Sequence, residues 1–408
     1  MKIFSLIILI ITCLSCNGNS EQINRAVTKV KMTALEDKEE LISVGANQTD
    51  VYLPLLKGKK VGVTANQTSV IFKGDNQSQI HLVDSLMLLN IDVKKVFAPE
   101  HGFRGRADAG EHIVDGVDAA TGLPIVSLYG TNSKPSKENL KDIDIMIFDI
   151  QDVGVRFYTY ISTLHYIMEA CAELNIPVVV LDRPNPNGHY VDGPILEAEL
   201  KSFVGMHPVP VVYGMTIGEY AKMINGEKWL NNEVQCDLTV VLLNGYTHDS
   251  EYALPIKPSP NLPNAVSVNL YPSLCFFEGT IVSCGRGTEM QFQVFGAPTL
   301  PNSPFDFSFT PRPNFGSKTP KYNGELCYGM DLMNEEKYNV INLDWLMAAY
   351  NSSLDKASFF NPFFSKLAGT KRLQKEIENG LSASAIKEIW QLGLDEFKER
   401  RVKYLLYK

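Results

Sequence analysis

Polar and titratable residues follow five short β-branched runs of the sequence, each at the point where the run ends. These loops are Asn66-Gln67-Thr68, Pro99-Glu100-His101-Gly102, Tyr129-Gly130, Gln151-Asp152-Val153-Gly154 and Asp182-Arg183-Pro184-Asn185-Pro186. In parallel α/β sheets ligands bind beyond the carboxyl ends of the strands, so we expect the five loops to meet at one rim. Any one of them is explained by turn chemistry alone, because Asn, Asp, Gly and Pro are common turn formers. Five together indicate a binding site.

Carboxylates, arginines and aromatic residues dominate these loops, and this combination is typical of carbohydrate hydrolysis. There, one carboxylic acid protonates the leaving oxygen while a second group stabilises an oxocarbenium-like centre. Glu100 is the best candidate for the acid, because Pro99 and His101 flank it at a strand end. The alternative for Glu100 is a residue that only caps its loop. Asp152 and Glu278 are the candidates for the second catalytic group.

Other reaction classes lack their motifs in this sequence. The dinucleotide fingerprint G-x-G-x-x-G does not follow the first strand-like run, and the pair Gly285 and Gly287 lacks the third glycine, which disfavours NAD. No G-x-S-x-G, Walker A lysine or H-E-x-x-H occurs. Two S-x-x-K patterns, at 353–356 and 384–387, lack the S-D-N and K-T-G partners of penicillin-binding enzymes. We therefore expect neither a cofactor nor a metal.

The candidate residues need a scaffold in which strands and helices alternate. Short buried runs predict strands at 61–64, 95–98, 125–128, 143–150, 177–181 and 238–243. Helical periodicity predicts helices over 81–89 and 160–174. This succession predicts an α/β fold with a Rossmann-like, mostly parallel sheet flanked by helices.

A proline-rich segment at 255–263 is unsuited to a helix or a central strand and indicates a domain boundary or a rigid lid. We predict a catalytic domain over 47–255 and a smaller α+β C-terminal domain over 256–408 that completes the cleft. The second part carries Glu278 and Arg286. It ends in a tail whose apolar residues recur at helical spacing and are expected to pack: Ile386, Ile389, Trp390, Leu394 and Phe397.

The N-terminus has the pattern of an export signal. Lys2 precedes an apolar run at 3–11 that is too short to span a bilayer, and the run ends in Leu14-Ser15-Cys16. That ending resembles a bacterial lipobox, although Cys13 stands where Leu is usual. We predict a signal peptide over 1–15, lipidation of Cys16 and a polar tether over 16–46, with plain signal cleavage as the alternative. The protein would then be exported and face the periplasm or the cell surface, with the lipid as its only membrane contact.

Composition bounds the remaining possibilities. A chain of 408 residues with 45% hydrophobic residues can bury a substantial core, and a formal charge of −8 argues against a nucleic-acid partner. Beyond Cys16 five cysteines remain, at irregular spacings, so we expect at most one or two disulfides. The sequence does not predict an oligomeric state.

Seven motifs in one order closely resemble the exo-β-N-acetylmuramidase family NamZ, formerly DUF1343. They are Phe97-Ala-Pro-Glu-His-Gly-Phe-Arg-Gly105, Ser127-Leu-Tyr-Gly130, Phe148-Asp-Ile-Gln-Asp-Val-Gly-Val-Arg-Phe-Tyr-Thr-Tyr160, Leu181-Asp-Arg-Pro-Asn-Pro186, Tyr213-Gly-Met-Thr-Ile-Gly-Glu219, Pro258-Ser-Pro-Asn-Leu-Pro263 and Glu278-Gly-Thr with Gly285-Arg-Gly-Thr288. The resemblance runs from about residue 61 to the Tyr-Leu-Leu-Tyr sequence at 404–407. It implies a Rossmann-like domain followed by a smaller one. The implied activity is removal of terminal β-1,4-linked N-acetylmuramic acid from non-reducing ends of peptidoglycan fragments.

The resemblance also implies site residues. Positions that match the family motifs are Glu100, Asp149, Gln151, Asp152, Arg156, Tyr158, Asp182 and Arg183. With them we expect Asn66, His101, Arg104, Tyr129, Asn261 and Arg286 to contact substrate. One departure is Cys284, where the family pattern leads us to expect Glu. The substrate's own N-acetyl group is a further candidate for the second catalytic group.

N-acetylmuramic acid differs from N-acetylglucosamine by a lactyl ether whose carboxylate is negative at neutral pH. A guanidinium suits a carboxylate, so Arg104, Arg156, Arg183 and Arg286 are the candidates to bind it. Arg156 and Arg183 are equally well explained as scaffold partners of Asp149, Asp152 or Asp182.

Three functions fit the sequence. The first is an exported muramidase, and the second is a glycan-binding lipoprotein that keeps the cleft without chemistry. An esterase or amidase acting on cell-wall material is the third, and the missing serine motif weighs against it. All three imply peptidoglycan-derived material as the partner.

Overall fold

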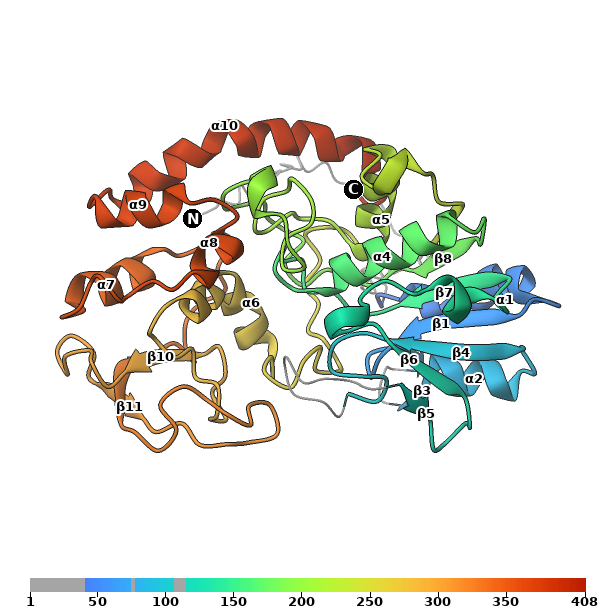
Figure 1. The fold of residues 1–408 in the computed structure, drawn as a ribbon, viewed down its shortest axis with the longest axis horizontal. Coiled ribbons are helices and arrows are strands. Elements are labelled where there is room, and N and C mark those ends of the chain that lie inside the picture. The colour runs from blue at the N-terminus through green and yellow to red at the C-terminus, as the bar shows by residue number, and fades with distance from the viewer. Residues whose placement is uncertain (1–40, 75–77, 106–114) are drawn as a thin grey trace, which may run out of the picture. The chain divides into compact units, whose positions relative to one another are not determined.

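The largest sheet of the structure, a computed structural model that describes residues 41–74, 78–105 and 115–408, has seven strands and lies on the right in Figure 1. The strand order is β5-β6-β4-β1-β7-β8-β9. The strands are β1 (Val61–Ala65), β4 (Val93–Ala98), β5 (Gly116–Val117), β6 (Pro124–Ser127), β7 (Ile145–Asp149), β8 (Val178–Leu181) and β9 (Leu238–Val241). Only the short edge strand β5 pairs antiparallel with its neighbour. The predicted α/β class and mostly parallel sheet are confirmed.

Both faces of the sheet are buried, which explains why its central strands have near-continuous apolar sequences. In β7, Met146 and Phe148 belong to one core cluster, whereas Ile145 and Ile147 belong to another. The first cluster includes apolar residues of α4 (Tyr160–Ala172) and α5 (Ile217–Gly226), and the second those of α1 (Thr49–Leu56) and α2 (Leu82–Leu88). The two pairs of helices therefore cover opposite faces of the sheet. The helices predicted over 81–89 and 160–174 are confirmed as α2 and α4.

Other elements lie outside this layered unit, and sequence patterns did not predict most of them. A hairpin pairs β2 (Val70–Lys73) with β3 (Ser78–His81). A three-stranded antiparallel sheet has the order β10-β12-β11. Its strands are β10 (Val294–Ala297), β11 (Phe307–Phe309) and β12 (Cys327–Asp331). The remaining α-helices are α3 (Lys137–Leu140), α6 (Ala265–Leu274), α7 (Asp344–Ser352), α8 (Phe363–Ala368), α9 (Arg372–Glu378) and α10 (Ala383–Arg401).

Short 3-10 helices and irregular segments complete the described chain. The 3-10 helices are η1 (Gly45–Asn47), η2 (Gly130–Asn132), η3 (Ala198–Leu200), η4 (Asn231–Glu233), η5 (Cys275–Gly279) and η6 (Val402–Tyr404). The proline-rich segment at 255–263 has neither helix nor strand, as its composition predicts. The domain boundary at 255 and 256 stays a prediction. In the described residues no helix is long and apolar enough to cross a membrane.

Helix α10 packs as predicted, with one correction. Ile386, Trp390, Leu394 and Phe397 are buried, but Ile389 is 46% exposed. At 100° per residue the four buried positions fall within about 80° of arc, whereas Ile389 lies about 60° outside it. Ile389 therefore contributes little to the core.

The C-terminal tail returns to the carboxyl edge of the sheet. The Tyr407 hydroxyl donates to Asp182 at 2.6 Å, and the amide of Leu406 donates to Glu219 at 2.7 Å. Glu219 caps α5 by accepting from the Thr216 amide, so the tail contacts the end of β8 and the start of α5. Asp182, predicted to bind substrate, is thus committed to the fold.

The five cysteines beyond residue 16 are all described by the structure, and all are buried and free. No disulfide therefore joins them. The predicted signal peptide, the lipidation site Cys16 and the tether up to residue 40 lie outside the described residues.

Candidate active site

Glu100 lies on a tight turn directly after β4. His101 and Gly102 both have left-handed backbone angles, with φ of 68° and 78°, and the Gly102 amide donates to the Pro99 carbonyl at 3.0 Å. A left-handed conformation is uncommon for a residue with a side chain, and such strain clusters at functional sites. The turn holds Glu100 and His101 at the wall of a cavity of about 190 Å³.

This cavity joins segments that are far apart in the sequence. Its wall includes aromatic residues that pack edge to face, with ring centroids 5.4 Å apart for Phe157 and Tyr271 and 4.8 Å apart for Tyr271 and Phe292. The full lining is Glu100, His101, Tyr129, Phe157, Tyr158, Thr159, Phe203, Val204, Ser259, Asn261, Leu262, Tyr271, Cys275, Glu278, Arg286, Phe292, Phe363 and Leu367. Such a lining offers apolar surface for a sugar ring and polar groups for its hydroxyls.

Two hydroxyl groups hold the Glu100 carboxylate. The Thr159 hydroxyl donates to Glu100 Oε2 at 2.8 Å. Burial raises the pKa of Tyr129, and the charge of Glu100 and a hydrogen bond to it raise that pKa further. Tyr129 therefore stays a neutral hydroxyl beside Glu100 at physiological pH.

Glu278 enters the same cavity from η5. Arg286 Nε donates to Glu278 Oε1 at 2.5 Å, and Cys275 Sγ lies 3.6 Å from Oε2. Lys321 fixes the turn that carries Glu278, because its ammonium donates to the backbone carbonyls of residues 277, 278, 280 and 282 at 2.7–3.5 Å. The Glu278 carboxylate is thus oriented by a salt bridge on a rigid support.

Cys284 occupies a second cavity of about 260 Å³ that shares Glu278 and Arg286 with the first. Burial, together with the charge of Glu278, raises the pKa of the Cys284 thiol to about 12, so the thiol is neutral at physiological pH. Position 284 thus contributes a neutral thiol instead of a carboxylate, and the carboxylate in the lining of the second cavity is Glu278.

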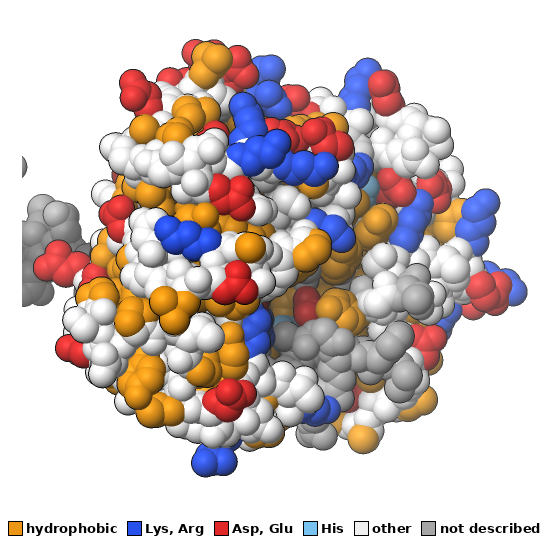
Figure 2. All heavy atoms as spheres, turned by 60° about the vertical axis from the view of Figure 1, so that its left-hand side comes forward, with side chains coloured by type: hydrophobic (Ala, Val, Ile, Leu, Met, Phe, Trp, Pro, Cys, Tyr) orange, Lys and Arg blue, Asp and Glu red, His pale blue; other side chains and the backbone are white. Residues whose placement is uncertain are grey.

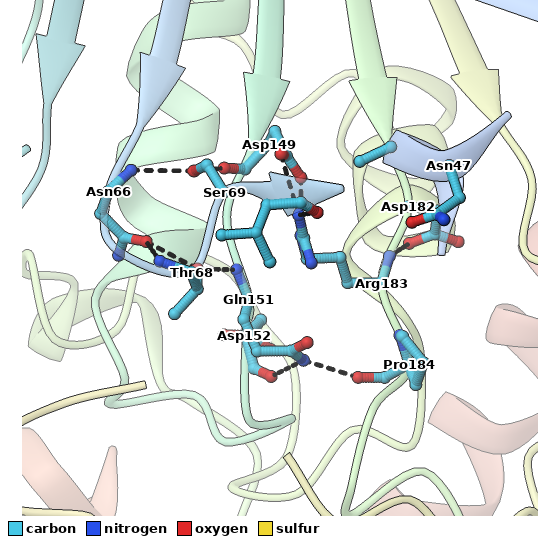
Figure 3. A network of polar contacts seen from close by, with 12 residues as sticks. Asn47, Asn66, Thr68, Ser69, Asp149, Gln151, Asp152, Asp182, Arg183 and Pro184 are labelled. Atoms are coloured by element: carbon cyan, nitrogen blue, oxygen red, sulfur yellow. Dashed lines mark hydrogen bonds and ion pairs between the residues drawn. The ribbon is translucent and has the colours of Figure 1, made fainter. Parts of the chain in front are cut away.

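A buried network at the sheet edge holds several predicted substrate residues (Figure 3). Arg183 donates to both oxygens of Asp149, at 2.6 and 2.9 Å, and to the Val70 carbonyl at 3.0 Å. Ser69 donates to the Asp149 carbonyl. Arg183 and Asp149 are therefore scaffold partners of each other and do not line the cavity, and their predicted contact with substrate stays a prediction.

The rest of the network holds Asn66 and Gln151 in a similar way. Asn66 Oδ1 accepts from the Thr68 hydroxyl at 2.6 Å, and that hydroxyl accepts from the Gln151 amide at 3.0 Å (Figure 3). Gln151 Nε2 donates to the Pro184 carbonyl at 2.7 Å. These contacts tie together three rim loops, and neither Asn66 nor Gln151 lines the cavity.

Arg156 and Arg104 are also committed away from the cavity. Arg156 is fully buried, and its two terminal nitrogens donate to the carbonyls of Pro194, Val209, Leu367 and Ala368 at 2.7–3.0 Å. Arg104 forms salt bridges with Asp84 and Asp118, each at 2.9 Å. Neither residue lines the cavity, because local acceptors already occupy the guanidinium groups, and their predicted substrate contacts stay predictions.

Asp152, predicted as a catalytic candidate, is buried and is not part of the lining of the cavity. Its Oδ2 accepts from the Tyr213 hydroxyl and, at 2.8 Å, from the Gly154 amide. Asp152 is only 4% exposed, and burial raises its pKa to about 6. The structure therefore brings together Glu100 and Glu278 and leaves Asp152 outside.

Among the predicted residues, seven line the cavity: Glu100, His101, Tyr129, Tyr158, Asn261, Glu278 and Arg286. Sequence reasoning missed Thr159, although it follows Tyr158 in a quoted motif. It also missed Phe203 and Tyr271, for which no local pattern gives a signal, because ordinary core aromatics look the same in a sequence.

The surface around the site carries both signs of charge. Figure 2 shows one face of the molecule, on which acidic and basic side chains are interspersed, with a hollow near its centre that contains apolar side chains. That face has no single-sign basic stripe of the kind that nucleic acids select.

A paired set of carboxylates, a guanidinium and aromatic rings at the carboxyl edge of a parallel sheet defines a carbohydrate site of an α/β protein. Comparison with known proteins agrees. The family model for the N-terminal part of exo-β-N-acetylmuramidase NamZ matches residues 61–266, and that for the C-terminal part matches residues 269–407. The chain therefore belongs to the NamZ exo-β-N-acetylmuramidase family.

Individual relatives support this assignment. The chain is 40% identical over 377 residues to peptidoglycan β-N-acetylmuramidase NamZ of Bacillus subtilis, which covers 87% of this chain and 89% of the relative. Two crystal structures of DUF1343 family proteins from Bacteroides fragilis are similar. One has a TM-score of 0.83 at 46% identity and the other 0.76 at 29%, and each match covers 90% of this chain and 99% of the other.

The Arg183–Asp149 pair should be measurable as a scaffold interaction. Removing one partner of a buried ion pair leaves an uncompensated charge and costs about 3–5 kcal/mol. We expect Arg183→Met to lower the free energy of unfolding by this amount in urea titrations. The double variant Asp149→Asn/Arg183→Met should recover part of the loss. A cost below about 1 kcal/mol for Arg183→Met would contradict the scaffold role.

The raised pKa of Asp152 leads us to expect that the stability of the protein depends on pH in a specific way. Its folded-state pKa of about 6 exceeds the ordinary value of 3.8, so the folded protein binds this proton more tightly than the unfolded chain does. The resulting stabilisation is full below about pH 4 and is lost as the pH rises through 6, a change of roughly 3 kcal/mol. Asp152→Asn should therefore gain stability relative to the wild type between pH 4 and pH 7. If the difference in unfolding free energy between variant and wild type stayed constant across that range, the pKa of Asp152 would not be raised by folding.

Proposed function

We propose that this protein is an exo-acting glycoside hydrolase that releases terminal β-1,4-linked N-acetylmuramic acid from the non-reducing ends of peptidoglycan fragments. The observation that carries the proposal is the pair Glu100 and Glu278, which line one aromatic cavity. Membership of the NamZ family supports the substrate and the reaction. The similarity to the peptidoglycan β-N-acetylmuramidase of Bacillus subtilis supports them too.

Glu100 is the proposed general acid. Its turn is rigid, and the hydroxyls of Thr159 and Tyr129 orient the carboxyl group with neutral donors. A protonated Glu100 can then deliver its proton to the glycosidic oxygen as the bond to the next sugar breaks. The aromatic wall formed by Phe157, Tyr271 and Phe292 would pack against the sugar and exclude water around the reacting bond.

Glu278 is the proposed second catalytic group. Its carboxyl group forms a salt bridge with Arg286, on a turn that Lys321 holds through backbone carbonyls. A fixed negative charge there stabilises the positive charge that develops on the sugar, whichever nucleophile completes the reaction. Asp152 has no such position, because it does not line the cavity and its Oδ2 accepts from Tyr213 and Gly154.

Substitution of the carboxylates tests these roles. Glu100→Gln keeps the volume but removes the donated proton, and general acid catalysis contributes roughly two to four orders of magnitude. We expect Glu100→Gln and Glu278→Gln each to lower kcat by at least about a hundredfold on muropeptide-derived disaccharides, with products read by mass. The matched variant Asp152→Asn should keep most of the rate. A Glu100→Gln enzyme with more than about a tenth of the wild-type rate would remove Glu100 from the acid role.

The same assay separates the two main functions. A purified wild-type protein that binds these disaccharides without releasing N-acetylmuramic acid would be a non-catalytic glycan-binding protein. Release of a single terminal sugar with the remaining fragment intact is the result expected of an exo-acting enzyme.

We propose further that the protein is exported and anchored through a lipid on Cys16. Lys2, the apolar run at 3–11 and Leu14-Ser15-Cys16 support this location, and a peptidoglycan substrate lies outside the cytoplasm. Cells expressing the full chain should incorporate labelled palmitate into the protein, and Cys16→Ala should abolish the incorporation. Equal labelling of both forms would exclude Cys16 as the acceptor.

A further inference from the structure

Discrimination between N-acetylmuramic acid and N-acetylglucosamine requires a feature that recognises the lactyl ether. The lactyl carboxylate is negative at neutral pH, whereas the protein carries a formal charge of −8 and its cavity already contains Glu100 and Glu278. An anionic substituent therefore binds only where a cation offsets both the repulsion and the loss of hydration. That cation has to belong to the cavity wall.

Arginine side chains near the rim are mostly engaged elsewhere. Both terminal nitrogens of Arg156 donate to backbone carbonyls, Arg183 is paired with Asp149, and Arg104 is paired with Asp84 and Asp118. Among the described lining residues of the two adjoining cavities, the permanently cationic side chains are Arg286 and Lys321. Lys321 uses its ammonium on the carbonyls around η5. This leaves Arg286.

Arg286 is bound on one edge of its guanidinium and open on the other. Within the described chain the hydrogen bond that it donates to a side chain runs from Nε to Glu278. Its central carbon lies 5.2 Å from the centroid of the Phe292 ring, which fixes the plane of the group. The side chain is 25% exposed and lines both cavities. The two terminal nitrogens can therefore bind a carboxylate in a bidentate manner.

The second cavity provides space on the far side of this guanidinium. It has a volume of about 260 Å³ and is lined by the hydroxyl residues Ser283, Ser317 and Thr319 and by the neutral thiol of Cys284. A carboxylate at position 284 would compete for Arg286, and this chain has none there. Glu278, Arg286 and Phe363 line both cavities, so the cavities adjoin and a sugar beside Glu100 can direct a substituent toward the second one.

We propose that Arg286 is the specificity residue for the lactyl carboxylate, and that the second cavity accommodates the lactyl arm. The inference rests on the proposed muramidase function and deepens it. Arg286 contacts the substrate in this assignment and also positions Glu278. A test therefore has to separate charge recognition from a general effect on the rate.

Three substrates make that separation: the p-nitrophenyl glycoside of N-acetylmuramic acid, the same compound with its lactyl carboxylate converted to a carboxamide, and the N-acetylglucosaminide. The wild type should prefer the carboxylate to the carboxamide in kcat/KM. Truncating one partner of a largely buried charge pair costs affinity on the order of a hundredfold. We expect Arg286→Met to lose about this factor on the carboxylate substrate and to bring the carboxylate-to-carboxamide ratio close to one.

Two further variants sharpen the test. Arg286→Lys keeps the charge but loses the planar fork, so it should retain an intermediate ratio. Arg312→Met is the matched control, because Arg312 is exposed and lines neither cavity. It should leave the ratio unchanged. Equal losses on the carboxylate and the carboxamide for Arg286→Met would overturn the proposal and leave Arg286 as a positioning residue for Glu278.

Binding measurements distinguish this inference from the muramidase function itself. If the wild type cleaved none of the glycosides, calorimetry with free N-acetylmuramic acid and its carboxamide would still report the ratio of affinities. A preference for the carboxylate that Arg286→Met removes supports the specificity site even without turnover. The same affinity for both compounds in the wild type would refute it.

Discussion

The buried ion pair between Asp149 and Arg183 is the interaction on which the rim of the sheet depends. It joins the end of β7 to the loop after β8, and the bond from Arg183 to the Val70 carbonyl adds the start of β2. A buried ion pair is stable only when nearly all hydrogen bonds of its two charged groups are formed. The segments that carry Asp149, Arg183 and Val70 must therefore keep the one arrangement in which these hydrogen bonds form.

Basic side chains serve three distinct purposes in this protein. Arg156 and Lys321 bind backbone carbonyls, Arg156 at the end of α8 and in loops at 194 and 209, and Lys321 within and after η5. Arg183 compensates a buried carboxylate, while Arg286 pairs with Glu278 and keeps donors toward the cavity. The chain has a net negative charge, and Arg156, Lys321 and Arg183 use their charged groups on partners within the fold. Among the described residues, the positive charge that faces the cavity is therefore confined to one place, at Arg286. Such an arrangement favours one anionic group at one place.

The proposed chemistry depends on two carboxylates that come from different halves of the chain. Glu100 follows a strand of the parallel sheet, whereas Glu278 ends a 3-10 helix after the proline-rich segment. The aromatic residues between them also come from both halves, and their edge-to-face packing makes one continuous wall. A change in either half would therefore alter the distance between the carboxylates, so the fold of the whole described chain sets the geometry of catalysis.

The sequence by itself determined six of the seven strands of the sheet, the covering helices α2 and α4 and the position of Glu100 at a strand end, because apolar runs and strand-end loops are local patterns with a direct structural meaning. Motif order likewise identified the family. Only the tertiary structure showed that most of the candidate arginines, and also Asp149, Gln151 and Asp152, bind partners within the fold. Whether a charged side chain faces a ligand or a buried partner depends on residues up to about two hundred positions away, as the bond from Arg156 to Ala368 shows. The sequence contains these partner residues, but it does not show which of them lie close together in the folded chain.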